Sequence, residues 1–121
     1  DTHAFLWWLA DDRRLRAAAR RAIEAPANEV LVSAASVWEI AVKMGSNKLS
    51  LASPERLPDL IAEAGFRELP VPARHAAAVR TLPPHHGDPF DRLLVAQAQL
   101  ERATLVSYDP QIARYEVSRL S

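Results

Sequence analysis

Hydrophobic residues recur along the chain at two spacings, which predict an alternation of helices and short strands. Apolar positions three and four residues apart indicate amphipathic helices, whereas short β-branched and apolar runs indicate buried strands. The predicted helices cover residues 5–9, 11–25, 34–44, 53 or 58 to 64, 72–82 and 88–101, and the predicted strands cover residues 30–32, 68–71 and 104–107. A short helix and an edge strand are expected after residue 110. Such an alternation is typical of a parallel α/β sheet.

The stretch 83–109 carries the clearest signals. Asp88 followed by Pro89 predicts a helix start, because an Asp side chain accepts hydrogen bonds from the first turn and Pro has no N–H there. Asp91 falls at the third helical position, where the helix N-terminus favours a negative charge. A broad apolar surface is predicted for this helix, with the polar remainder Arg92, Gln97, Gln99 and Glu101. A short strand follows, and Asp109 is placed like another helix cap.

Composition fits one globular domain. The chain has 121 residues, of which 49% are hydrophobic and 25% charged, which is enough apolar material for a core. The fifteen basic and fifteen acidic residues give a net charge of zero, so a nucleic-acid partner would have to bind a local basic patch. The lack of cysteine excludes a disulfide framework and a Cys-based metal or nucleophile site. No apolar run reaches membrane-spanning length, and we expect a soluble, cytoplasmic protein.

A basic face is predicted for the helix over residues 11–25, which Asp11 and Asp12 are expected to cap. Its arginines fall away from the apolar stripe: Arg13, Arg14, Arg16, Arg20 and Arg21, a third of the chain's fifteen basic residues. A solvated face that pairs with nearby acids is the commoner explanation of such a run. The functional alternative is a surface that contacts a phosphate backbone.

The helix predicted over residues 34–44 separates an apolar side from a polar one. The positions expected in the core follow the i, i+3, i+4, i+7 rule: Val37, Ile40, Ala41 and Met44. At about 100° per residue, Glu39 then projects outward from this helix. A purely structural role for Glu39 is an i, i+4 ion pair with Lys43, which contributes roughly 0.3 kcal/mol to helix stability.

Four acids lie near strand-to-helix junctions or on a helix face outside the predicted core: Asp1, Glu39, Asp91 and Asp109. The strands of a parallel sheet could gather them at one edge. Oxygen ligands without cysteine suit Mg²⁺ or Mn²⁺ rather than Zn²⁺. Because three of the four also have capping or pairing explanations, spacing leaves both interpretations open. In a parallel sheet, a short apolar strand is expected before Asp1, which would place its carboxylate at a ligand-binding sheet edge.

Four stretches resemble PIN domains, and specifically the VapC-type toxin ribonucleases of bacterial toxin–antitoxin pairs. They read DTHAFLWWLADDRRL, SAASVWEIAVK, LPPHHGDPFDRLLVAQAQLE and ATLVSYDPQIARY, and they extend to about Tyr115. The resemblance implies a three-layer α/β/α sandwich with a mostly parallel sheet of four or five strands. Residues 1–121 would form a single such domain that lacks most of its first strand. The implied catalytic and metal-binding residues are Asp1, Glu39, Asp91 and Asp109.

The same resemblance implies Mg²⁺- or Mn²⁺-dependent cleavage of single-stranded RNA by the toxin of a toxin–antitoxin pair. The expected partners are an RNA substrate, a cognate antitoxin and a second copy of the chain in a homodimer. RNA contacts are expected from Arg13, Arg16, Arg20 and Lys43. The chain departs from the family in two ways. Its first strand is absent apart from the last acid, and Arg102 stands where relatives often have a helix-ending Gly.

Two other kinds of enzyme are alternatives to this interpretation. Histidine catalysis would use His85 and His86, but neighbours in a Pro-flanked turn rarely point at one target. These histidines are therefore interpreted as loop residues or as residues that support the metal ligands. A phospho-acceptor receiver domain needs an Asp at a mid-chain strand end, and residues 49–57 offer only Glu55.

The strongest alternative that is not an enzyme is a PIN-like interaction module. In that case the acids only cap helices, and the domain binds a partner peptide. The groove for such a peptide would be lined by Trp7, Trp8 and Trp38 together with apolar edges of the first helices. Chelator-sensitive degradation of RNA separates this module from the nuclease.

Overall fold

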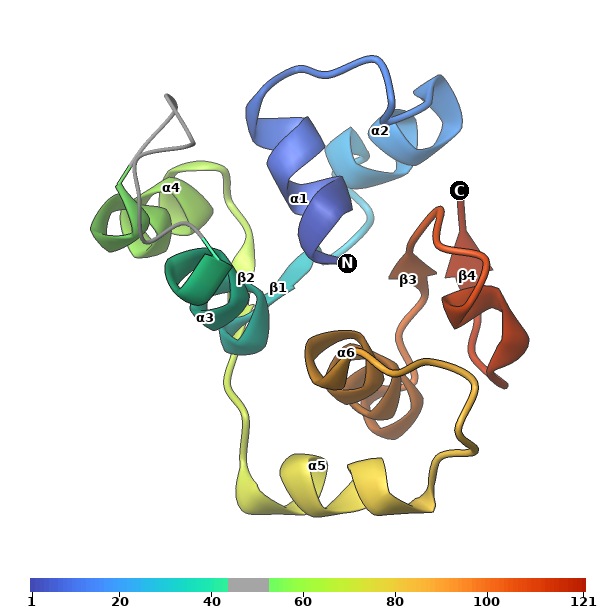
Figure 1. The fold of residues 1–121 in the computed structure, drawn as a ribbon. Coiled ribbons are helices and arrows are strands. Elements are labelled where there is room, and N and C mark those ends of the chain that lie inside the picture. Colours follow the sequence, from blue (N-terminus) through green and yellow to red (C-terminus); the bar gives the residue numbers. More distant parts are fainter. Residues whose placement is uncertain (44–52) are drawn as a thin grey trace.

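The structure is a computed structural model that describes residues 1–43 and 53–121. Met44, which the sequence places in the core, lies outside these ranges. The α-helices are α1 (Thr2–Leu9), α2 (Ala17–Glu24), α3 (Ala34–Lys43), α4 (Leu57–Glu63), α5 (Ala73–Ala78) and α6 (Pro89–Glu101) (Figure 1). Short 3-10 helices occupy η1 (Pro54–Arg56), η2 (Val79–Thr81) and η3 (Ile112–Arg114). Each predicted helix therefore has a counterpart within the described residues.

The described strands form two parallel pairs. Strand β1 (Leu31–Ser33) pairs with β2 (Arg67–Leu69), and β3 (Leu105–Val106) pairs with β4 (Arg119–Leu120). Figure 1 shows α1 and α2 on one side of the strands and α5 and α6 on the other. Parallel strands between two helical layers confirm the predicted α/β class. The described residues form two pairs of strands rather than one continuous sheet.

A cavity of about 480 Å³ lies between the two strand pairs. Its lining includes Val32 and Ser33 of β1 and Leu105 and Val106 of β3, together with apolar side chains of α1 and α6. The amino group of Asp1 donates a hydrogen bond to the carbonyl oxygen of Val106 at 2.5 Å, so the start of α1 is tied to β3. The cavity therefore separates β1 from β3 at the centre of the strand layer.

The hydrophobic core consists of three clusters, each of which joins distant segments. The first packs α1, β1, α3 and α4 together through Phe5, Val32, Ile40, Leu57 and Ile61. The second packs α6 against the C-terminal segment through Leu82, Val95, Ala96, Ile112 and Tyr115. The third holds α1 near α2 through Ala4, Leu15 and Ala19. Since α3 and α6 belong to different clusters, their polar sides can face a common space.

Local signals in the sequence located the helix ends well. Asp88 accepts a hydrogen bond from the Asp91 N–H at 3.1 Å and caps α6, as predicted. Gly65 has a φ of +79° after α4, and Phe66 donates back to the carbonyl of Ile61. Arg102 has a φ of 52° and ends α6 in the left-handed region, where a Gly would fit without strain.

The predicted cap of the second helix is wrong. Helix α2 begins only at Ala17, and Asp11 has a φ of 51° in the preceding turn. The carboxylate of Asp12 accepts from the backbone N–H and the guanidinium of Arg14 instead. Such local side-chain bonds compete with helix formation, so the residues before Ala17 form a turn.

The polarity predicted for α3 is also wrong. Glu39 is only 3% exposed, whereas Ala41, which was expected in the core, is exposed. The reason is that α3 packs against α1 on one side and α6 on another, so it has two buried sides rather than one apolar stripe. Every described helix falls short of the length and apolar character that a bilayer crossing needs.

Candidate metal centre

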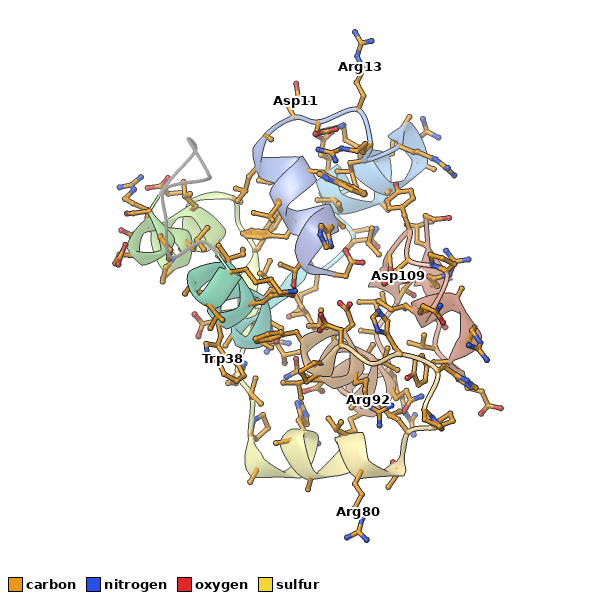
Figure 2. All side chains as sticks on the ribbon, viewed as in Figure 1. Asp11, Arg13, Trp38, Arg80, Arg92 and Asp109 are labelled. Carbon is orange, nitrogen blue, oxygen red and sulfur yellow. The ribbon has the colours of Figure 1, made fainter. Side chains whose placement is uncertain are left out.

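The tightest group of titratable side chains within the described residues joins α6 to the segment after β3. His86 Nε2 lies 2.8 Å from Asp109 Oδ2 and 3.0 Å from Asp91 Oδ2. Together these residues can offer three ligand atoms that lie within 4.8 Å of one another. Asp91 comes from the first turn of α6, whereas Asp109 follows β3 (Figure 2). Two of the predicted acids thus meet at one point.

Asp1 is linked to this group through one serine. The Ser107 hydroxyl donates to Asp1 Oδ2 at 2.7 Å, and its oxygen accepts from the backbone N–H of Asp109 at 3.1 Å. The other oxygen of Asp1 caps α1 by accepting from the Ala4 N–H at 2.8 Å. Asp1 therefore caps α1 and contacts Ser107 at the same time, because its carboxylate has two oxygens for two hydrogen bonds.

Glu39 reaches the same region from α3. Its Oε2 accepts from Lys43 Nζ at 2.5 Å, and Lys43 also lies 3.3 Å from Asp88 Oδ2. Its Oε1 is buried and has no hydrogen-bond partner among the described residues. A buried carboxylate oxygen without a donor is costly, so this atom indicates an absent cation or donor. The ion pair with Lys43 thus accounts for only one of the two carboxylate oxygens of Glu39.

The charges in this region repel one another. Burial raises the pKa of Asp91, and the negative charges of Asp88, Glu39 and Asp109 raise it further. For Asp109, burial alone would raise the pKa, but hydrogen bonds from the Gln111 N–H and from His86 outweigh it and hold the pKa below its usual value. Acids that oppose each other's ionisation in a partly buried site are suited to binding a cation.

The ring of His86 is positioned by a network centred on α6. Its backbone N–H donates to the Tyr115 hydroxyl at 2.9 Å, and its Nδ1 accepts from the Asp88 N–H at 3.0 Å. Arg92 donates to the same hydroxyl at 3.1 Å and to the carbonyls of Val79, Leu82 and Pro83. From the sequence, His86 is interpreted either as a loop residue or as a residue that supports the metal ligands. Its position two residues before the Asp88 cap was the signal that could have located it.

The donor set fits a hard divalent cation. Carboxylate oxygens dominate the site, the chain has no cysteine, and Glu39 Oε1 lacks a donor among the described residues. Mg²⁺ and Mn²⁺ prefer such oxygen ligands. Asp91 and Asp109 lie together, while Asp1 and Glu39 approach from α1 and α3 outside the 4.8 Å group. Asp91 and Asp109 are therefore the acids that the structure brings together for a cation, and the donor types suit Mg²⁺ and Mn²⁺ equally.

The three predicted RNA-contacting arginines lie on α2 and in the turn before it. Arg13 points away from the protein (Figure 2). Arg16 lies over the ring of Tyr108 at 5.3 Å, and Arg20 pairs with Asp11 at 3.1 Å. The bland explanation of this face, pairing with nearby acids, thus applies to Arg20.

Two comparisons with known proteins found a match for this chain. The PIN domain family profile matches residues 1–117. Among curated proteins, the chain is 32% identical to Ribonuclease VapC22 from Mycobacterium tuberculosis over 124 aligned positions, which cover 98% of this chain and 92% of the relative. Both matches include every residue of the group described above.

Proposed function

The chain belongs to the PIN domain family, and we propose on that basis that it is a metal-dependent endoribonuclease. It acts as the toxin of a toxin–antitoxin pair and hydrolyses phosphodiester bonds of RNA. The observation that carries this proposal is the meeting of Asp91 and Asp109, together with a buried oxygen of Glu39 that has no hydrogen-bond partner within the described residues. The similarity to a relative named as a ribonuclease supports it.

The proposed ligands of Mg²⁺ or Mn²⁺ are Asp1, Glu39, Asp91 and Asp109. When bound, such a cation supplies an activated water for attack at phosphorus and stabilises the leaving oxygen. The protein's own part is to hold the acids close together in spite of their repulsion. Ser107 orients Asp1 and the backbone of Asp109, and Lys43 holds one oxygen of Glu39. No protein nucleophile is needed.

RNA binding is proposed for Arg13, Arg16, Arg20 and Lys43. The first three supply positive charge on α2 and the turn before it, while Lys43 pairs with Glu39 and Asp88. Phosphate contacts of this kind position the strand without reading its sequence. Because Lys43 already bonds to Glu39 and Asp88, its contribution to RNA affinity is expected to be smaller than that of an unpaired lysine.

The remaining partners follow the same proposal. The protein works in the cytoplasm, binds a cognate antitoxin and forms a homodimer. For the alternative as a peptide-binding module, only Trp8 of the three tryptophans lines the central cavity. Trp38 is 60% exposed and packs against Phe90 instead. The three residues therefore do not line one groove, and the nuclease is favoured.

A strand before Asp1 is proposed to fill the cavity between β1 and β3. Both strands present an edge that is unpaired within the described residues, and Asp1 N already donates to Val106 O as a strand residue would. Such a strand would join the two pairs into one parallel sheet. Extending the chain before Asp1 with a short apolar strand should raise the melting temperature and the Mn²⁺ affinity. Unchanged values would contradict this placement.

The test of the proposed function is cleavage of single-stranded RNA by the purified protein. We expect cleavage with Mn²⁺ or Mg²⁺, none with a chelator, and recovery when the metal is restored. A double variant, Asp91→Asn with Asp109→Asn, controls for contaminating nucleases because it should remain folded and inactive. Cleavage that survives the chelator, or that the double variant retains, would refute the proposal.

A further inference from the structure

The imidazole of His86 stands where a cation shared by Asp91 and Asp109 would have to sit. Its Nε2 lies 3.0 Å from Asp91 Oδ2 and 2.8 Å from Asp109 Oδ2, so both oxygens are aimed at one nitrogen. A metal ion bound to the same two oxygens would lie about 2.0–2.1 Å from each. It would occupy nearly the same space as the hydrogen on Nε2. The ring and the cation therefore exclude each other at this point.

The hydrogen-bond pattern shows that Nε2 is a donor rather than a metal ligand. Nδ1 accepts from the backbone N–H of Asp88 at 3.0 Å, so Nδ1 carries a lone pair and the ring proton is on Nε2. If that proton moved to Nδ1, the Nδ1–H of His86 would point at the backbone N–H of Asp88, and two donors would face each other. Asp88 is the N-cap of α6, and the bond from the Asp91 N–H to its side chain fixes the residue at the helix start, so its own N–H cannot easily turn away.

Both carboxylate oxygens of Asp109 accept a hydrogen bond, so a cation that binds Asp109 has to replace one of the two donors. Its Oδ1 accepts from the backbone N–H of Gln111 at 2.8 Å, in the turn that begins after Asp109. Its Oδ2 is the atom that His86 holds. A side-chain donor is easier to displace than a backbone donor fixed in a turn. An ion that recruits Asp109 would therefore do so by replacing the N–H of His86 at Oδ2.

We propose that His86 is a displaceable bridge, which holds Asp91 and Asp109 together without metal and releases Asp109 when a divalent cation binds. In the metal-free protein, the N–H offsets part of the repulsion between these carboxylates. His86 is thus a positioning residue whose hydrogen bonds compete with the metal. The inference rests on the proposed metal site, but it concerns only binding of the ion.

The ring is well placed for such an exchange. Its side chain is 15% exposed, so it is held at the rim of the site rather than in the core. The backbone of His86 is anchored by the Tyr115 hydroxyl, which Arg92 also contacts. A rotation of the side chain would therefore release Asp109 without moving the loop. The neighbouring His85 packs edge-on against Tyr115 at 5.0 Å, and within the described residues its ring forms no hydrogen bond or ion pair with either acid, which makes it a matched control.

Calorimetric titration with Mn²⁺, in the absence of RNA, tests the bridge. His86→Ala should bind Mn²⁺ roughly tenfold more tightly than the unchanged protein, because one charge-assisted hydrogen bond no longer competes. His86→Gln, which keeps a donor nitrogen, should return the affinity toward the original value. His85→Ala should leave it unchanged. An affinity that stays the same or falls in His86→Ala would overturn the proposal, and so would an equal gain in His85→Ala.

A second measurement covers the case in which His86→Ala does not fold. Magnetic resonance of the unchanged protein during titration with Mg²⁺ should shift the ring signals of His86 and leave those of His85 in place. Ring signals of His86 that do not move as the site saturates would overturn the proposal, and so would failure to bind any divalent ion. Failure of the proposed function gives a different result. A protein that passes both metal-binding tests but does not cleave RNA would be a metal-binding domain without nuclease activity.

Discussion

Two polar clusters lie on helix α6, and they differ in how completely they are satisfied. Toward its C-terminal end, Gln97 is buried and accepts from the Ser33 hydroxyl at 2.5 Å, while its amide contacts the carbonyl of Pro70 and His75 Nδ1 at 3.0 and 3.1 Å. At its first turn, Asp91 lies among acids that raise its pKa, near an unpartnered oxygen of Glu39. The first cluster is a network of hydrogen bonds around the Gln97 amide, and the second is a group of carboxylates around Asp91.

The difference separates a structural cluster from a functional one. The network of Gln97 ties β1, α5 and α6 together, and its groups have partners apart from His75 Nε2, which lies 3.6 Å from Glu101 Oε1. Satisfied networks stabilise a particular fold. At the start of α6, burial and the neighbouring acids raise the pKa of Asp91, so its ionisation opposes folding. Burial and polarity are common to both clusters, whereas repulsion between carboxylates is particular to the second.

The largest expected effect comes from removing charge at the start of α6. Asp91→Asn keeps the shape of the side chain and removes one proposed ligand, so RNA cleavage should fall by at least about 100-fold. Cleavage rates at saturating Mn²⁺, with circular dichroism to confirm folding, provide the measurement. Gln97→Asn, which shortens the amide in the other cluster, serves as the comparison and should retain cleavage wherever it is folded. Near-normal cleavage by Asp91→Asn would reverse the roles assigned to the two clusters.

The second effect concerns stability. Gln97→Ala removes a buried amide and strands the Ser33 hydroxyl, so the free energy of unfolding should fall by roughly 2–3 kcal/mol. Gln99→Ala is the matched control on the same helix, because Gln99 is exposed and bonds only to the Glu116 carbonyl. It should change the free energy by no more than about 0.5 kcal/mol. Equal losses in urea denaturation would show that the buried network adds nothing beyond helix propensity.

Asp88, the N-cap of α6, is interpreted as a structural acid rather than a metal ligand. Asp88→Ala removes the cap and should cost about 1 kcal/mol of stability. For Asp88, burial alone would raise the pKa, but bonds from the Asp91 N–H and from Lys43 outweigh it and lower the pKa. Its contribution is therefore present above the ordinary Asp value of 3.8 and lost as pH falls through the lowered folded-state pKa. Cleavage should persist in the folded variant, and its loss would assign Asp88 to the site.

The raised pKa of Asp91 predicts the opposite sign. Its ionisation opposes folding, so the stability of the metal-free protein should decline as pH rises from 3.8 through the raised folded-state pKa. Asp91→Asn cannot ionise, so the variant should be the more stable protein at neutral pH and equal to the original in acid. Thermal melting across this pH range, with chelator present, measures the gap. A gap that widens toward low pH would contradict the assigned repulsion.

The smallest effect is expected on the arginine side. If Arg16 and Arg20 contact RNA phosphates, changing both to Ala should flatten the dependence of log affinity on log salt by about 0.7 per lost contact. A control pair, Arg74→Ala with Arg80→Ala, removes the same charge from α5 and η2, at the opposite end of the molecule from α2 (Figure 1). An unchanged slope, or an equal change in the control pair, would leave the arginines as a solvated face.

The sequence by itself determined the elements and most of their ends. The cap of α6 joins Asp88 to Asp91, three residues apart, and such short-range bonds are visible in a pattern. The parallel order of the strands followed from the alternation of helix and strand. The cap predicted for α2 failed because the bond between Asp12 and Arg14 is just as local and competes with the helix.

Only the tertiary structure decided which polar groups meet. Asp1 and Ser107 are 106 positions apart, and His86 and Asp109 are 23 apart, so no local pattern pairs them. Glu39 and Gln97 were placed on polar faces because periodicity assumes one buried side per helix, yet α3 packs against α1 as well as α6. A polar side chain on a second buried side costs free energy unless it finds a partner, and those partners come from other segments. The elements therefore follow from neighbours in the chain, and the site follows from neighbours in space.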